Sequence, residues 1–398
     1  MTAPESAPAH DAHTVHSAFG PPPTNLQLFS AIGVGVVSLY LAGLVSLLFG
    51  ALVNEGRLTQ GGIGLAAGGE ALVMALCTGL LGAVVPSKRL KLWGVVGALL
   101  LAAADAGTMA AHGNGIVLLR AMAGIPEGIL LWITIGMIAR TATPERWAAI
   151  LFTSCTITQV AGAGLLTAFL LPRFGANGGF AMLAVVGLAG VALSLFVPDQ
   201  FAPLPKGEGE SGAPPPRGWL ALAAILMLAS AIAAVGVYLL PLAQRHGMTQ
   251  AAASAAVTVS LIAQIPGGGL AALIAGRVRY LLVFTVGALG WLAVFLIFGL
   301  PTPGWAVFVA MALAGIVILL VPPFFVPMTI EVDGSRRTAV QSGAVQLLAG
   351  ALGPLAAALL VGDRDIRGVL WLAGAMLAIG LGLSAVLHFT ATHEESGV

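Results

Sequence analysis

Four ionisable residues lie inside long apolar stretches of the first half of the chain: Glu70, Asp105, Arg120 and Glu127. If these stretches cross a membrane, each charge costs roughly 2.5–3.5 kcal/mol at a helix centre, so a partner or a function is expected for each. Arginine pairs with carboxylates, and a carboxyl group without an obvious base holds and releases protons. The residue types therefore indicate ion pairing and proton transfer.

Glu70, Asp105 and Arg120 are expected at the same depth. At 1.5 Å per residue, each lies roughly 8–9 Å from the outer end of its own apolar stretch. We therefore expect Arg120 to pair with Glu70, with Asp105, or with both. Such a cluster is either a structural ion pair that holds the first half together, or an outer gate or proton relay.

Glu127 follows Arg120 by seven residues, so it faces nearly the same way but lies about 10 Å deeper. We expect no direct contact between the two. Pro126 cannot donate a backbone hydrogen bond and should loosen the helix beside Glu127. A midplane carboxyl group without a base suits proton coupling or contact with a solute. The alternative is a protonated acid with a structural role.

The composition indicates which solvent surrounds these stretches. Of the 398 residues, 58% are hydrophobic and only 8% are charged, whereas soluble domains carry about 25% charged residues. Such a chain cannot bury its apolar surface in water, so we expect a multi-pass membrane protein. The net charge of +1 gives no indication of nucleic-acid binding.

The chain divides into apolar stretches of about 20 residues, the length that crosses a bilayer as a helix. We predict an all-α integral membrane protein of twelve transmembrane helices in two six-helix lobes. The predicted parts are a disordered cytoplasmic tail (1–24), an N-terminal lobe (25–197), a cytoplasmic linker (198–217), a C-terminal lobe (218–390) and a cytoplasmic tail (391–398). The predicted spans are 28–53, 65–85, 91–111, 115–139, 147–171, 177–197, 218–243, 250–275, 281–300, 304–330, 338–360 and 367–389.

Basic residues predict the orientation, because cytoplasmic loops of membrane proteins are enriched in Lys and Arg. With both termini in the cytoplasm, the inner connections hold the larger group: Lys88, Arg89, Lys91, Arg140, Arg146, Lys206, Arg217, Arg277, Arg279, Arg336 and Arg337. The outer connections hold the smaller one: Arg57, Arg173, Arg245, Arg364 and Arg367. We expect a bacterial inner (plasma) membrane with both termini cytoplasmic.

The fourth predicted span carries the residues of a family resemblance. Ile116, Arg120, Gly124 and Gly128 resemble the fourth-helix motif of the major facilitator superfamily, in which Arg is followed four residues later by Gly. The resemblance implies a two-lobed secondary transporter whose first, fourth, seventh and tenth helices line a central cavity.

The signature loops of that family depart from their pattern here. Gly82 fits the first glycine after span two, but Pro86 stands where the acidic residue belongs. The stretch around Gly162 lacks the Gly-Pro of proton-driven drug antiporters, which counts against drug efflux. The loops keep their basic residues, our candidates for cytoplasmic gating: Lys88, Arg89, Arg277 and Arg279.

The resemblance also suggests which side chains meet the solute. Few polar groups fall on the cavity-lining spans, and a mostly apolar cavity suits a small amphipathic organic solute. Arg120 can grip a carboxylate, but if the acids neutralise it, a cation at Glu127 is as plausible. The substrate or gate candidates are Arg120, Tyr40, Ser38, Tyr238, Gln264, Gln341 and Gln346.

We therefore predict alternating-access transport coupled to protons, with Glu127, Asp105 and Glu70 as proton-coupling candidates. Two alternatives use the same fold: a lipid-handling or scramblase-like protein, and a non-transporting sensor or assembly factor. The chain shows no nucleophile arrangement or phosphate loop, so no enzyme and no cofactor is expected. His10, His13 and His16 are spaced by three, but a disordered tail is favoured over a metal site. The expected partners are the solute, protons and the lipid bilayer, with the protein a monomer.

Overall fold

The computed structural model describes residues 24–141, 143–201, 213–333, 337–362 and 365–395. The predicted N-terminal tail, including His10, His13 and His16, and most of the predicted linker lie outside these residues. Within them, every regular element is a helix, and one isolated bridge joins Lys88 to Gln200. The prediction of an all-α protein is confirmed.

The helices of the first half are α2 (Asn25–Leu39), η1 (Leu41–Gly43), α3 (Val45–Asn54), α4 (Gln60–Val84), α5 (Leu90–Thr108), α6 (Asn114–Ile138), α7 (Pro144–Leu165), η2 (Leu166–Leu170) and α8 (Leu171–Ser194). Those of the second half are α9 (Pro216–Gly236), α10 (Leu239–Arg245), α11 (Gln250–Ile274), α12 (Tyr280–Gly299), α13 (Gly304–Leu320), η3 (Pro322–Phe324), α14 (Phe325–Val332), α15 (Arg337–Leu360) and α16 (Gly368–Glu395).

These helices provide twelve membrane crossings in the described part of the chain. Ten helices are long and apolar enough to cross a membrane, and two shorter apolar helices, α2 and α3, follow one another at the start. The longest of the ten, Arg146–Ser194, turns at Gly175, whose φ of 60° is left-handed, and so provides two crossings. With α2 and α3 taken as one crossing, the predicted count of twelve fits.

Three of the crossings are interrupted partway. The first is broken by η1, the seventh by a turn at Val237 and Tyr238, and the tenth by η3 at Pro322. The third break coincides with two consecutive prolines, Pro322 and Pro323. Proline has no N–H to donate, so consecutive prolines end α13 and start a new helix.

Threonine side chains begin several helices by accepting hydrogen bonds from otherwise unpaired backbone N–H groups. Thr59 Oγ1 accepts from Gly62 N at 3.0 Å, and Thr249 Oγ1 accepts from Ala252 N at 3.3 Å. The two caps start α4 and α11, which are the second crossing of each half. A threonine N-cap therefore starts the corresponding helix in each of the two halves.

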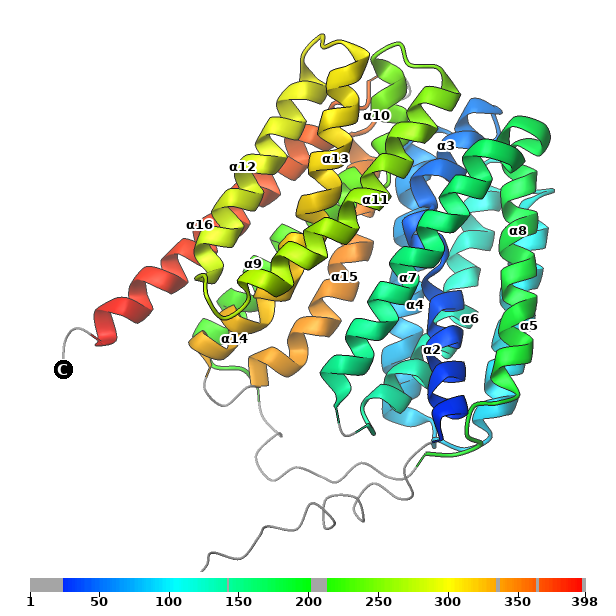
Figure 1. Ribbon diagram of the computed structural model, residues 1–398, viewed down its shortest axis with the longest axis horizontal. Coiled ribbons are helices and arrows are strands. Elements are labelled where there is room, and N and C mark those ends of the chain that lie inside the picture. Colours follow the sequence, from blue (N-terminus) through cyan, green and yellow to red (C-terminus); the bar gives the residue numbers. More distant parts are fainter. Residues whose placement is uncertain (1–23, 142, 202–212, 334–336, 363–364, 396–398) are drawn as a thin grey trace, which may run out of the picture.

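The two halves lie side by side. Figure 1 shows α2–α8 on one side of the molecule and α9–α16 on the other. Between them, α4 packs against α15, and α3 packs against α10. The described chain starts with α2 at the lower end of Figure 1, and α16 also ends toward the lower part of the view.

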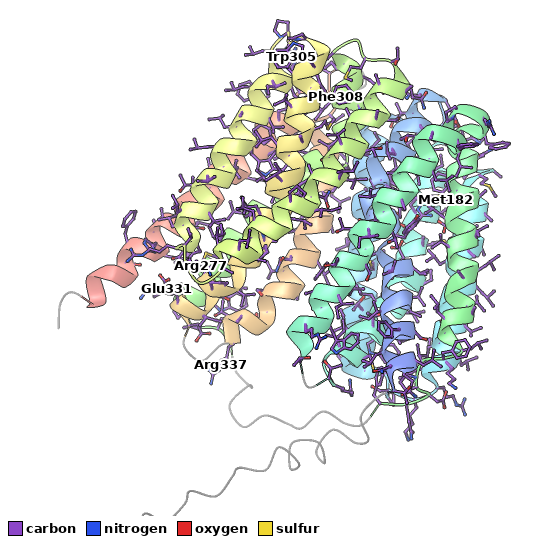
Figure 2. All side chains as sticks on the ribbon, in the orientation of Figure 1. Met182, Arg277, Trp305, Phe308, Glu331 and Arg337 are labelled. Atoms are coloured by element: carbon purple, nitrogen blue, oxygen red, sulfur yellow. The ribbon has the colours of Figure 1, made fainter. Side chains whose placement is uncertain are left out.

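The outer surface is apolar, as expected for contact with lipid. Leu359 and Trp371 are 83% and 79% exposed. Figure 2 shows Arg277 and Arg337 at the lower end of the second half and Trp305 at its upper end. Basic and amphipathic aromatic side chains at the two ends of an apolar belt are typical of a membrane protein.

Candidate functional site

Arg120 is the centre of a buried ion cluster. Its Nε donates to Glu70 Oε2 at 3.1 Å, its Nη2 pairs with Glu70 Oε1, and its Nη1 donates to Asp105 Oδ1 at 2.6 Å. The Arg120 side chain has no exposed surface, and its guanidinium carbon lies 5.8 Å from the centre of the Phe180 ring. Arg120 therefore pairs with both acids, and no face of it is left for a solute.

Glu127 belongs to the same cluster, contrary to our expectation. Its Oε1 lies 3.9 Å from Arg120 Nη2, within ion-pair range but beyond a hydrogen bond. The expectation considered only the rise between Cα atoms. Side chains on a helix tilt toward its N-terminus, so Glu127 extends back toward Arg120 on the same face of α6. The long arginine side chain closes the remaining gap.

Glycines bring the helices of this cluster close together. A Cβ atom at Gly124 would collide with Glu70 O on α4, and one at Gly128 would lie 2.8 Å from Met74 O. Only a residue without a side chain permits this approach between α6 and α4. The Arg120–Gly124–Gly128 spacing of the sequence motif therefore places the Glu70 carboxylate within reach of the guanidinium.

Pro126 does not interrupt α6, which runs unbroken from Asn114 to Ile138. Neighbouring helices donate hydrogen bonds to carbonyl groups around the proline. Ser38 Oγ donates to Glu127 O at 2.8 Å, and Thr78 Oγ1 donates to Gly128 O at 3.2 Å. The expected loosening is therefore not seen, and side chains from α2 and α4 bind α6 just after the proline.

A cavity of about 420 Å³ lies between the two halves next to the cluster. Its wall is mostly apolar, and among the described residues that line it the ionisable ones are Glu70 and Glu127. Arg120 and Asp105 do not line it and instead border a small void of about 10 Å³ behind Glu127. The cavity therefore meets the carboxylate side of the ion cluster.

The cavity contains only some of the residues predicted to meet the solute. Ser38, Gln264 and Gln346 line it. Tyr40 borders the small void instead, and the lining of the cavity does not include Tyr238 or Gln341. Tyr238 is fully buried, and a Cβ at Gly64 would lie 2.7 Å from its hydroxyl.

Three polar residues of the lining are not among the candidates named from the sequence: Ser46, Gln159 and Ser260. Gln159 donates from Nε2 to Leu39 O at 2.8 Å, which leaves its amide oxygen for the cavity. Each is a polar residue within an apolar stretch. That signal was present in the sequence, but it does not distinguish cavity residues from residues that bond their own helix.

The two halves touch each other on one side of the cavity. Leu240 N on α10 donates to Ser46 Oγ on α3 at 2.7 Å. Gly68 on α4 lies against α15, where its Cβ would lie 2.5 Å from Leu355 Cγ and 2.8 Å from Ala351 O. The labels of α3 and α10 place the α3–α10 contact toward the upper end of Figure 1.

The predicted gating loops have different structures in the two halves. In the first half, Leu90 N donates to Asp199 O at 2.9 Å, and Phe201 N donates to Ser87 O at 3.0 Å. Lys88 and Arg89 lie in this loop, and Arg140 stacks over the Phe201 ring at 4.7 Å. We call this pairing of residues 87–90 with 199–201 the clasp.

In the second half, the corresponding loop (275–279) has the same length as that of the first half (85–89) but makes different contacts. Arg277 donates to Leu273 O of its own helix, and Arg279 is the residue that precedes α12. The described contacts therefore place Lys88 and Arg89 in a folded connection, and Arg277 and Arg279 at the end of α11 and the start of α12.

The second half holds ionisable contacts that the sequence did not reveal. Glu331 Oε1 accepts from the Tyr280 hydroxyl at 3.4 Å and lies 3.5 Å from His388 Nδ1. The Tyr280 and His388 rings pack edge to face at 5.4 Å. Figure 2 shows Glu331 at the lower end of the second half, away from the α3–α10 contact.

A further unpredicted contact joins three connections of the first half. Arg57 Nη2 donates to Thr108 O at 2.7 Å, and Arg57 Nη1 donates to Asn177 Oδ1 at 2.7 Å. Glu55 Oε1 accepts from Ala176 N at 2.6 Å, at the turn between the fifth and sixth crossings. These bonds tie the end of α3 to the end of α5 and to the start of the sixth crossing.

Comparisons with known proteins agree with this architecture. A family model described as Major Facilitator Superfamily matches residues 26–351. No curated protein was matched by its sequence.

Several solved transporters have a similar structure. A bacterial homologue of the human lysosomal transporter Spinster, in an inward-facing and unoccupied conformation, is 14% identical with a TM-score of 0.63, covering 92% of this chain and 96% of its own. The nucleoside transporter NupG is 14% identical with a TM-score of 0.66, covering 92% and 98%. A D-xylose-proton symporter is 14% identical with a TM-score of 0.69, covering 90% and 96%. At these identities the likeness shows the fold.

Proposed function

Because the chain belongs to the major facilitator superfamily, a family of transporters rather than enzymes, we propose that it moves a small amphipathic organic solute by alternating access, coupled to protons. The proposal goes beyond family and fold by naming the kind of solute and the coupling ion.

One observation carries the proposal: in the described part of the chain, the carboxyl groups of the cluster beside the cavity outnumber their basic partner, Arg120. Glu70 and Glu127 line the cavity, and both share Arg120 with Asp105. One guanidinium cannot neutralise three carboxylates, and surplus negative charge in a buried site is costly. A proton bound at Glu127 relieves that cost, and its release into the cavity supplies the coupling step.

Alternating access requires a cavity that is closed at one end at a time. The contacts between α3 and α10 and between α4 and α15 close one side in this structure. We propose that the six-helix lobes 25–197 and 218–390 rock about the cavity, with Lys88, Arg89, Arg277 and Arg279 in the loops that gate the opposite side.

The positive-inside rule assigns that opposite side to the cytoplasm. Figure 2 shows Arg277 and Arg337 there, and the described chain begins with α2 at the same end. We therefore propose an inward-facing state of a monomeric inner-membrane protein with both termini cytoplasmic. The similar Spinster homologue was solved in an inward-facing conformation.

The test begins with thermal unfolding of the purified protein at about pH 5.5 and pH 8 against a panel of organic anions, organic cations, neutral amphiphiles and lipids. A ligand that binds the folded state raises its stability by mass action. Any solute that stabilises the protein is then added to proteoliposomes that contain a pH-sensitive dye. We expect solute-driven proton movement in the wild type and none in Glu127→Gln, which keeps the side-chain shape but cannot ionise.

Glu331→Gln is the matched control, because it removes a carboxylate that lies outside the lining of the cavity. It should leave proton movement unchanged. Solute uptake without proton movement in the wild type would refute the coupling. Stabilisation by lipids alone, without uptake of any organic solute, would favour a lipid-handling protein instead.

A further inference from the structure

We infer that the solute binds as an organic cation, with its charged group at Glu127 and its apolar body against the second half. This inference rests on the proposed function, because it takes the cavity between the halves as the solute site. It decides between the two solute charges that the sequence left open, a carboxylate held by Arg120 and a cation held by Glu127.

Among the described residues around the cavity, Arg120 is the basic group that could hold an anion. Glu70 takes its Nε and Nη2, Asp105 takes its Nη1, and the side chain has no exposed surface. It does not line the cavity. An anionic solute would have to displace Glu70 and then lie against Glu127, so like charges would meet.

Glu127 is the least neutralised carboxyl group of the cluster. Glu70 and Asp105 hydrogen-bond to the guanidinium, whereas Glu127 Oε1 stays 3.9 Å from it. Glu127 also lines the cavity. Its carboxylate is therefore the strongest site for a cation that the described lining offers.

Two of the three glutamines that line the cavity, Gln159 and Gln346, have their amide groups turned the same way. Gln159 donates from Nε2 to Leu39 O at 2.8 Å, and Gln346 donates from Nε2 to Ser342 O at 3.4 Å. Both amide NH2 groups are thus directed to backbone carbonyls. The oxygens remain for the solute, and an amide oxygen is an acceptor that suits an ammonium donor.

The wall that the second half provides determines which uncharged groups the solute can carry. Residues of the second half that line the cavity are mostly aliphatic and can hold an alkyl or aryl group. The cavity volume of about 420 Å³ accommodates a drug-sized molecule. Its aliphatic lining from the second half includes Ile232, Val237, Leu261, Ile318 and Leu347.

A cation and a proton then compete for the same carboxylate. The ionisable groups that face Glu127 are Glu70 from α4, Asp105 from α5, Arg120 from α6, and Tyr40 between α2 and η1. Of these, only Arg120 is basic, and it is already paired. Binding of the cation at Glu127 therefore displaces a proton, which makes the coupling an exchange of one for the other.

The experiment compares three probes of one shape by thermal unfolding of the full-length protein. They are 4-phenylbutylammonium, the neutral 4-phenylbutan-1-ol and the anionic 5-phenylpentanoate. We expect the cation to stabilise the wild type and the anion to have no effect. The cation should act at pH 8 at concentrations at least tenfold lower than those needed at pH 5.5. Glu127→Gln should weaken binding of the cation at least tenfold at pH 8.

The matched control is Glu331→Gln, which removes the same charge from a carboxyl group outside the lining of the cavity. It should change cation binding less than threefold. Stronger binding of the anion or the alcohol would overturn the inference, and so would an equal loss in Glu331→Gln and Glu127→Gln. If the cation binds as expected but drives no proton movement in proteoliposomes, the cation site stands and the proposed proton-coupled transport fails.

Discussion

The close contact between α4 and α15 gives a direct way to shift the protein between its conformations. Gly68 on α4 has no side chain, and α15 packs against it through Leu355 and Ala351. We predict that Gly68→Val separates the two halves on this side of the cavity. The substitution acts on the conformational equilibrium because the contact joins different halves.

The magnitude follows from the geometry. A Cβ at Gly68 would lie 2.5 Å from Leu355 Cγ, 2.8 Å from Ala351 O and 2.9 Å from Leu355 N. Two of these atoms belong to the α15 backbone, so rotation of a side chain does not relieve the overlap. Extra atoms in a packed contact cost about 1–3 kcal/mol. An energy of that size lowers the population of the closed contact about 5- to 150-fold relative to the separated state.

The assay measures the distance between spin labels across this contact by pulsed electron paramagnetic resonance. Labels at Asn54→Cys, the end of α3, and Arg245→Cys, the end of α10, report on the two halves. The native Cys77 and Cys155 are first replaced by serine. We expect the Gly68→Val distribution to move to longer distances in lipid nanodiscs.

Gly79→Val is the control, because Gly79 lies on the same helix and a Cβ there meets no atom within 4 Å. Both variants make the same change in helix propensity, so the control isolates the contact between the halves. Identical distance distributions for Gly68→Val and Gly79→Val would refute the assignment of this contact as the closed side of an alternating-access cycle.

The remaining predictions concern stability, measured by thermal and denaturant unfolding in detergent. Arg57→Ala should lower the free energy of unfolding by at least about 2 kcal/mol, because bonds from a charged donor are worth about 1.5–3 kcal/mol each; a smaller loss than for Arg57→Lys would contradict this. Asp365→Asn should leave the melting temperature unchanged, since Asp365 and Arg367 form a half-exposed ion pair. Arg120→Met should cost about 3–5 kcal/mol by leaving buried carboxyl groups without a partner, and adding Asp105→Asn should restore part of the loss rather than add to it.

The sequence predicts the helices of this protein well because lipid imposes one rule on all of them. Every crossing must be apolar and must satisfy its own backbone hydrogen bonds, so the apolar stretches translate directly into helices. The same rule makes the few charges conspicuous, which is why the pairing of Arg120 with Glu70 and Asp105 is predicted and confirmed.

The rest of the site depends on side-chain reach and on neighbours distant in sequence. Helical rise alone places Glu127 too far from Arg120, but both side chains extend along α6 and the gap closes to 3.9 Å. Gln159 meets the cavity because its crossing packs next to the break at η1, which is a tertiary property. Arg57 binds the carbonyl of Thr108, and no residue type marks such an acceptor in a sequence.

The clasp has a consequence for the order in which the protein is made. Residues 199–201 return to the loop that holds Ser87 and Leu90, so the last of its backbone bonds forms with Phe201. All of its partners precede the second half in the chain. Because domains generally fold in order as synthesis proceeds, the first six crossings can lock their own connection while the ribosome is still adding α9. The second half then inserts beside a finished neighbour, and the ion cluster around Arg120 is buried before the cavity it borders is complete.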